Sequence, residues 1–194
     1  MRHQPKCIED VETIIESDYT WTTIQGWLKP QVLKVRGVFC AVTAVLNAMP
    51  ISREKAAEIF DYIFDHHDSD GTILFEKFLH HFQQVQKGTG FYLEPYKLKH
   101  RITFADVALV LSPRNGVAVI SYCTTSMTSH TISIDIDNCL ILDPDKRNND
   151  VMNFTSFQDD TYMQILEKLN VFNLDTPVVS HVYFVRRKKG RHEH

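Results

Sequence analysis

Apolar residues recur along the chain with two different spacings, first that of helices and later that of strands. Up to about residue 111, apolar side chains recur mostly at helical spacing. This pattern predicts helices over residues 8–17, from residue 52 onward, over 72–85 and over 103–111, the last with Thr103 as its N-cap. Residues 92–98 interrupt these helices and look extended. We therefore expect the first part of the chain to be mainly helical.

Beyond residue 111 the pattern becomes that of strands. Residues 117–122 form a compact apolar run, 131–137 alternate strictly as T-I-S-I-D-I-D, and 139–142 follow after a turn. A helix is predicted near 161–169, and a strand over 178–185 closes this part. Helices first and an antiparallel-looking sheet later are typical of an α+β fold.

Length and composition are those of one globular domain. The 194 residues are 43% hydrophobic and 23% charged, with a net charge of −3, which does not favour a nucleic-acid partner. No apolar stretch is long enough for a secretory signal or a membrane span. We expect a single domain over residues 1–187 followed by a basic tail over 188–194. The scattered cysteines, with no C-x-x-C pair, favour free thiols and a cytoplasmic location.

Cys40 is the candidate nucleophile. It follows Gly37, which permits a sharp turn, and it opens a small, apolar, helix-like run that ends at Pro50. A thiol in the first turn of a helix faces unpaired backbone N–H groups and the positive end of the helix dipole, which favour the thiolate. The alternative is that Cys40 is a buried packing residue, because free cysteine is commonly found in protein cores.

His130 and Asp143 are the candidate base and its orienting group. If Asp137 and Asn138 form a two-residue turn, a pair that accepts positive φ, then Ile132 lies opposite Asp143 and His130 shares that face. The two side chains are then diagonal neighbours on adjacent strands. A turn one residue longer would place them on opposite faces. Gln31 is the candidate side-chain donor to an oxyanion, beside the backbone N–H of Cys40.

Several segments, in order, resemble the catalytic domain of phytochelatin synthase. They are C-A-V-T-A-V-L-N-A-M-P-I from Cys40, D-G-T-I-L-F-E-K-F, I-S-Y-C-T-T-S-M-T-S-H ending at His130, C-L-I-L-D ending at Asp143, and H-V-Y-F-V-R-R. The resemblance implies a papain-like cysteine peptidase fold, in which a helical portion carrying the nucleophile helix packs on an antiparallel sheet. It also implies a catalytic triad of Cys40, His130 and Asp143.

The same resemblance implies a thiol acyltransferase or peptidase that cleaves the Cys–Gly bond of glutathione through a γ-glutamylcysteinyl thioester on Cys40. Lys146 and Arg147 follow the aspartate, where the family has a basic residue that could hold a substrate carboxylate. No cofactor is implied, and a divalent metal enters only as a metal–thiolate complex of the substrate. The chain departs from the family at the oxyanion position, where the family spacing falls on Lys34 rather than Gln31.

Three other functions stay open. Two are enzymatic, a papain-like cysteine protease or a glutamine deamidase acting on a protein substrate. The third is an inactive papain-like binding module. A calcium-binding loop around residues 66–77 is not expected, because Lys77 occupies the position where such a loop needs a glutamate.

Overall fold

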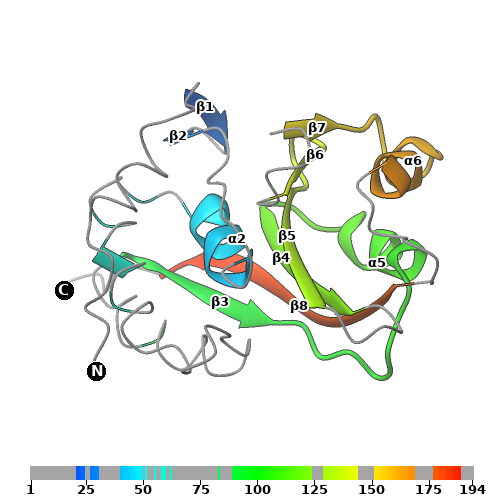
Figure 1. The fold of residues 1–194 in the computed structure, drawn as a ribbon, viewed down its shortest axis with the longest axis horizontal. Helices are drawn as coiled ribbons and strands as arrows, with labels where there is room; N and C mark the ends of the chain where they lie inside the picture. The colour runs from blue at the N-terminus through cyan, green and yellow to red at the C-terminus, as the bar shows by residue number, and fades with distance from the viewer. Residues whose placement is uncertain are drawn as a thin grey trace, which may run out of the picture.

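The computed structural model describes residues 21–24, 27–30, 40–49, 51, 55, 58, 59, 62, 83, 89–123, 129–143, 151–168 and 177–188. Within these residues the elements, in chain order, are β1 (Trp21–Ile24), β2 (Trp27–Pro30), α2 (Cys40–Ala48), β3 (Phe91–Pro95), α5 (Phe104–Leu111), β4 (Val117–Cys123), β5 (Ser129–Asp135), β6 (Leu140–Leu142), β7 (Val151–Asn153), α6 (Thr161–Lys168) and β8 (Val178–Arg187) (Figure 1). The helix predicted over 8–17, and all of the one over 72–85 except the helical Gln83, lie outside the described residues.

A six-stranded antiparallel sheet, in the order β3-β8-β4-β5-β6-β7, forms the centre of the described structure. The predicted strands over 117–122, 131–137, 139–142 and 178–185 correspond to β4, β5, β6 and β8. The α+β class is therefore confirmed. The sequence pattern did not predict β7 at the edge of the sheet or the separate β1–β2 hairpin.

The β5–β6 connection has the predicted register but not the predicted turn. Ile134 lies opposite Ile141, as expected. The turn, however, takes in residues 136–139, and Cys139 has the positive φ of 53°. The Asp135 carboxylate closes this wider turn by accepting bonds from the Asn138 backbone N–H at 3.2 Å and from its Nδ2 at 2.9 Å. The expectation of a two-residue turn with positive φ at 137 and 138 is therefore wrong. Four residues are again an even number, so each side chain keeps its face.

One face of the sheet is apolar and is covered by α5 and α6. Ile120, Ile132, Ile134 and Phe184 from the strands belong to one buried cluster with residues of both helices. From the helices this cluster includes Phe104, Val107, Leu111, Tyr162 and Leu166. Burying this continuous apolar surface supplies the main stabilisation of the described part of the chain.

The opposite face of β4 and β5 is lined by small hydroxyl side chains and contacts α2. The Ser121 and Thr131 hydroxyls hydrogen-bond to each other at 2.8 Å, and Ser133 Oγ donates to the Ala44 carbonyl of α2 at 2.7 Å. All three hydroxyl residues are buried. Small side chains on both elements let the helix backbone approach the strands closely, and the buried hydroxyls are satisfied within that contact.

The start of α5 is fixed by a capping box. Thr103 donates to Asp106 Oδ2 through its backbone N–H at 3.0 Å and its hydroxyl at 2.8 Å, and it accepts from the Asp106 N–H. The predicted N-cap is therefore confirmed. The hydrogen bonds from Thr103 hold the pKa of the Asp106 carboxyl below its usual value.

Replacing Thr103 by alanine removes the capping hydroxyl. We expect Thr103→Ala to lower the free energy of unfolding by about 1 kcal/mol at neutral pH, measured by urea denaturation. Since Asp106 has a lowered pKa in the folded chain, its stabilising effect is complete above the unfolded pKa of about 4 and is lost as the pH falls from there through the lower pKa of the folded chain. The gap between variant and wild type should therefore shrink in acid. Thr155→Ala, at an exposed site, should change the stability by less than about 0.5 kcal/mol.

Ser133 tests how closely α2 lies against β5. Ser133→Ala should cost about 1 kcal/mol, because it removes a buried hydrogen bond. Ser133→Val should cost about 1–3 kcal/mol, because two methyl groups must fit between helix and strand. The matched control is Ser129→Ala, at an exposed position of the same strand, which should be nearly neutral. A valine variant as stable as wild type would contradict a close contact at this position.

Candidate active site

His130 and Asp143 form a hydrogen-bonded pair. His130 Nε2 lies 2.8 Å from Asp143 Oδ1. The Asp143 side chain is 1% exposed and that of His130 is 23% exposed, so the carboxylate is buried and the imidazole reaches the surface. Because an ionised carboxylate only accepts hydrogen bonds, Nε2 carries the proton in this pair. In the neutral imidazole, Nδ1 is then the nitrogen that can accept a proton.

The register of the sheet brings the two residues together. His130 is the second residue of β5, and Asp143 directly follows β6. Extending the pairing of Ser133 with Leu142 by one residue places Ile132 opposite Asp143. His130 is then diagonal to Asp143 on the same face. The proximity predicted from the sequence is confirmed, although the turn that produces it differs.

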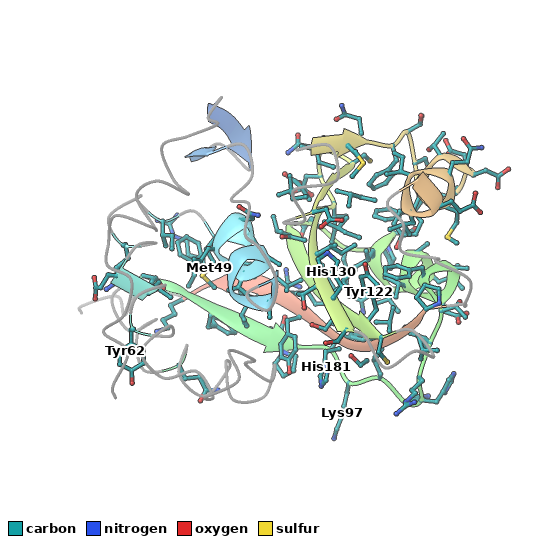
Figure 2. All side chains as sticks on the ribbon, viewed as in Figure 1. Met49, Tyr62, Lys97, Tyr122, His130 and His181 are labelled. Carbon is teal, nitrogen blue, oxygen red and sulfur yellow. The ribbon has the colours of Figure 1, made fainter. Side chains whose placement is uncertain are left out.

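An aromatic ring from β4 packs against the imidazole. Tyr122 lies opposite His130 in the β4–β5 pairing, and the two ring centroids are 5.7 Å apart with an interplanar angle of 86° (Figure 2). Tyr122 in turn contacts Phe104, at 5.0 Å between centroids. The sequence reading missed this contact. The contact depends on the long-range register between β4 and β5, and the sequence T-T-S-M-T-S over 124–129 carries no turn signal that predicts this register.

Cys40 is the first residue of α2, as predicted. Its backbone N–H is one of those that have no partner within a helix, and it lies at the positive end of the helix dipole. The Cys40 side chain lies outside the described part of the chain. The position of α2 is nevertheless defined by the bond from Ser133 to Ala44, one helical turn after Cys40.

Strand alternation sets a condition on any meeting of Cys40 with His130. Ser133 faces α2. Because His130 is an odd number of residues away, its side chain lies on the opposite face of β5. A thiol and an imidazole on these two elements can meet only at the end of the strand, where β5 begins. His130 lies one residue from that end.

The other predicted site residues lie outside the described residues. Gln31, Lys146 and Arg147 are among them, so their proposed contacts with an oxyanion or a substrate carboxylate stay predictions. In the described ranges, no three histidine, cysteine or acidic side chains gather as metal ligands. Nor does the described part include a helix long and apolar enough to cross a membrane.

An irregularity in β8 lies close to the candidate site and had no signal in the sequence. Ser121 pairs with His181 but Tyr122 pairs with Val179, which leaves Ser180 as an extra residue. Ser180 Oγ donates to the Ser121 carbonyl at 3.1 Å and lies 3.0 Å from His181 Nδ1. This bulge is across β4 from the row that contains His130.

Comparison with known proteins finds one distant structural similarity. The chain is similar to the crystal structure of the Pseudomonas avirulence protein AvrPphB, with a TM-score of 0.40 and 17% sequence identity, over 69% of this chain and 71% of that one. A similarity of this size assigns neither a family nor an activity. No protein-family model and no curated protein matches the chain. The resemblance to phytochelatin synthase therefore stays a prediction.

Proposed function

We propose that the protein is a cysteine-dependent acyltransferase or peptidase with a triad of Cys40, His130 and Asp143. The observation that carries this proposal is the 2.8 Å bond between His130 Nε2 and the buried Asp143 carboxylate. Such a pair holds an imidazole in one tautomer and stabilises the imidazolium that forms when it takes a proton. We further propose that residues 1–187 act as one papain-like catalytic domain.

In the first half of the reaction, His130 Nδ1 accepts the Cys40 thiol proton. The thiolate then attacks a substrate carbonyl carbon, forming a C–S bond while the carbonyl oxygen becomes an oxyanion. The Cys40 backbone N–H is the natural donor to this oxyanion, with Gln31 as the candidate second donor. As the amide C–N bond breaks, the imidazolium returns its proton to the departing amine. The product is a thioester on Cys40.

In the second half, an acceptor releases the acyl group. Water or a thiol-peptide amine gives a proton to His130 and attacks the thioester carbonyl. The C–S bond breaks, and the Cys40 thiolate regains the proton from the imidazolium. With water the reaction is hydrolysis, and with an amine it is acyl transfer. The same residues serve both outcomes, so the acceptor decides which product forms.

The substrate that we propose is glutathione, cleaved at its Cys–Gly bond. The support is the sequence resemblance around Cys40, His130 and Asp143. Lys146 and Arg147 closely follow Asp143 in the sequence and would hold a substrate carboxylate. We propose no resident metal or cofactor, because the steps above need only thiol, imidazole and carboxylate.

One observation favours a second candidate, a binding module without catalysis. The α2 helix contacts the face of β5 that carries Ser133, whereas strand alternation places the His130 side chain on the other face. If the sheet does not bring the imidazole round to the thiol, Cys40 has no base. The reactivity of the thiol separates the two candidates directly.

Labelling of Cys40 with iodoacetamide as a function of pH tests whether its thiol is activated. A thiolate–imidazolium pair should make Cys40 react well below about pH 8.5, the pKa of an ordinary thiol. Cys123 and Cys139 are the internal controls. Burial raises the pKa of the Cys139 thiol, so it should react later than Cys40 as the pH rises. Labelling is followed residue by residue by mass spectrometry of peptides.

Two outcomes are informative in that experiment. Cys123→Ala and Cys139→Ala should leave the low-pH labelling in place, whereas Cys40→Ala should remove it. A Cys40 that labels only at the pH of an ordinary thiol would contradict the enzymatic proposal and favour the binding module.

Incubation with glutathione tests the proposed substrate. Incubation with glutathione should release glycine and leave a γ-glutamylcysteinyl adduct on Cys40, detected by intact-mass spectrometry of acid-quenched samples. Cys40→Ala should abolish release. His130→Gln should lower the rate by about a hundredfold to ten-thousandfold, because it removes the general base. Asp143→Asn should also lower it strongly, because the imidazole keeps its place but loses the carboxylate that fixes the tautomer able to accept the thiol proton.

Glycine release can fail while the low-pH labelling of Cys40 succeeds. That result would reject glutathione and leave a protein substrate, to be sought with protease and glutamine-deamidase assays.

A further inference from the structure

We propose that Tyr122 is a positioning residue for the His130 base. This inference rests on the proposed function, since it assigns a role to the imidazole of the same site. It concerns a residue that the reaction steps do not use. The contact between the two rings is its starting point.

The Tyr122 ring restricts how the imidazole can turn. A hydrogen bond to Asp143 fixes one atom of the imidazole, Nε2, at 2.8 Å from Oδ1. The ring is held at Cγ by its covalent bond and at Nε2 by this hydrogen bond, but it can still rotate about the line through these two atoms. That rotation moves Nδ1, the nitrogen that must meet a thiol, and a contact on the ring restricts it. The Tyr122 ring, at 86° to the imidazole and 5.7 Å between centroids, supplies that contact.

The Tyr122 ring is itself held in place. Tyr122 is 4% exposed, and its ring packs on Phe104 at 5.0 Å and 73°. Phe104 is buried and is the first residue of α5, directly after the Thr103 cap. A capped helix end, two aromatic rings and the imidazole therefore form one continuous packed series. Edge-to-face aromatic pairs of this kind prefer defined relative orientations.

His130 is partly exposed, whereas Asp143 and Tyr122, which contact it, are buried. A partly exposed histidine beside only one partner would sample several rotamers. With a buried acceptor at Nε2 and a buried ring beside it, the imidazole is confined although 23% of the side chain is exposed. This is the arrangement that a preorganised base requires.

The experiment compares three variants of the full chain. Tyr122→Leu removes the ring, and Tyr122→Phe keeps it. Tyr96→Leu is the matched control, because Tyr96 packs on Phe184 at the same interplanar angle of 86° in the same core but does not contact His130. Urea denaturation identifies the variants that remain folded. Two readouts follow, the pH dependence of Cys40 labelling and the NMR signals of the His130 ring nitrogens.

We expect Tyr122→Leu to move the midpoint of Cys40 labelling upward, toward about pH 8.5, and to slow labelling at pH 6 by about tenfold. Its His130 ring nitrogens should show exchange between tautomers in place of one form protonated at Nε2. Tyr122→Phe should retain the wild-type midpoint and a single tautomer. Tyr96→Leu should lose stability without moving either readout. If Tyr122→Leu does not fold, Phe104→Leu, which removes the aromatic ring that packs on Tyr122, should shift both readouts in the same direction.

The inference is overturned if folded Tyr122→Leu, or Phe104→Leu in its place, keeps the wild-type midpoint and tautomer, or if Tyr96→Leu shifts them equally. Failure of the proposed function looks different, because it shows in the wild-type protein as a Cys40 that labels like an ordinary thiol. In that case the NMR readout still decides whether Tyr122 holds the imidazole.

Discussion

The contact between His130 and Asp143 depends on the register between β5 and β6. Because successive side chains on a strand point to opposite faces, a slip of one residue would turn the imidazole and the carboxylate away from each other. The register is held at the turn by the Asp135 carboxylate, which accepts two bonds from Asn138. It is held along the strands by the burial of Ile134 and Ile141, which are opposite each other on the apolar face. Packing of the core and placement of the site are therefore parts of a single constraint.

The two faces of the sheet carry different kinds of side chain for a physical reason. Aliphatic and aromatic residues face α5 and α6, where the stabilisation comes from apolar area removed from water. The other face of β4 and β5 carries Ser121, Thr131 and Ser133, and it contacts α2. Larger side chains there would hold the helix away from the strands. A buried hydroxyl face that is fully hydrogen-bonded costs little and allows a short distance between the start of α2 and the sheet.

Local signals in the sequence were sufficient for the elements that depend on local chemistry. Thr103 and Asp106 form a box that requires only four residues, and the alternation of residues 131–137 identified β5 and its apolar face. The turn at 136–139 was not predictable in the same way, because its hydrogen-bond partners come from elsewhere. The Ile136 N–H donates to the Gly116 carbonyl and the Cys139 carbonyl accepts from the Phe154 N–H, so neighbouring segments take the groups that would close a two-residue turn. The packing of Tyr122 on His130 depends likewise on a long-range register.

Strand alternation stands against the proposed pairing of His130 with Cys40, because it places the imidazole on the α5 side of β5 while α2 packs on the other side. The proposed triad therefore requires additional twist at the end of the sheet. A β-bulge bends its strand and increases local right-handed twist. The extra residue Ser180 lies between the pairings of Ser121 and Tyr122, and Tyr122 is the direct neighbour of His130 in the next strand pair. The one register shift among the described strands of this sheet thus lies next to the row that contains His130, where a bulge favours the twist that the proposed triad requires. A flat, regular sheet with the same residues would keep Cys40 and His130 on separate faces.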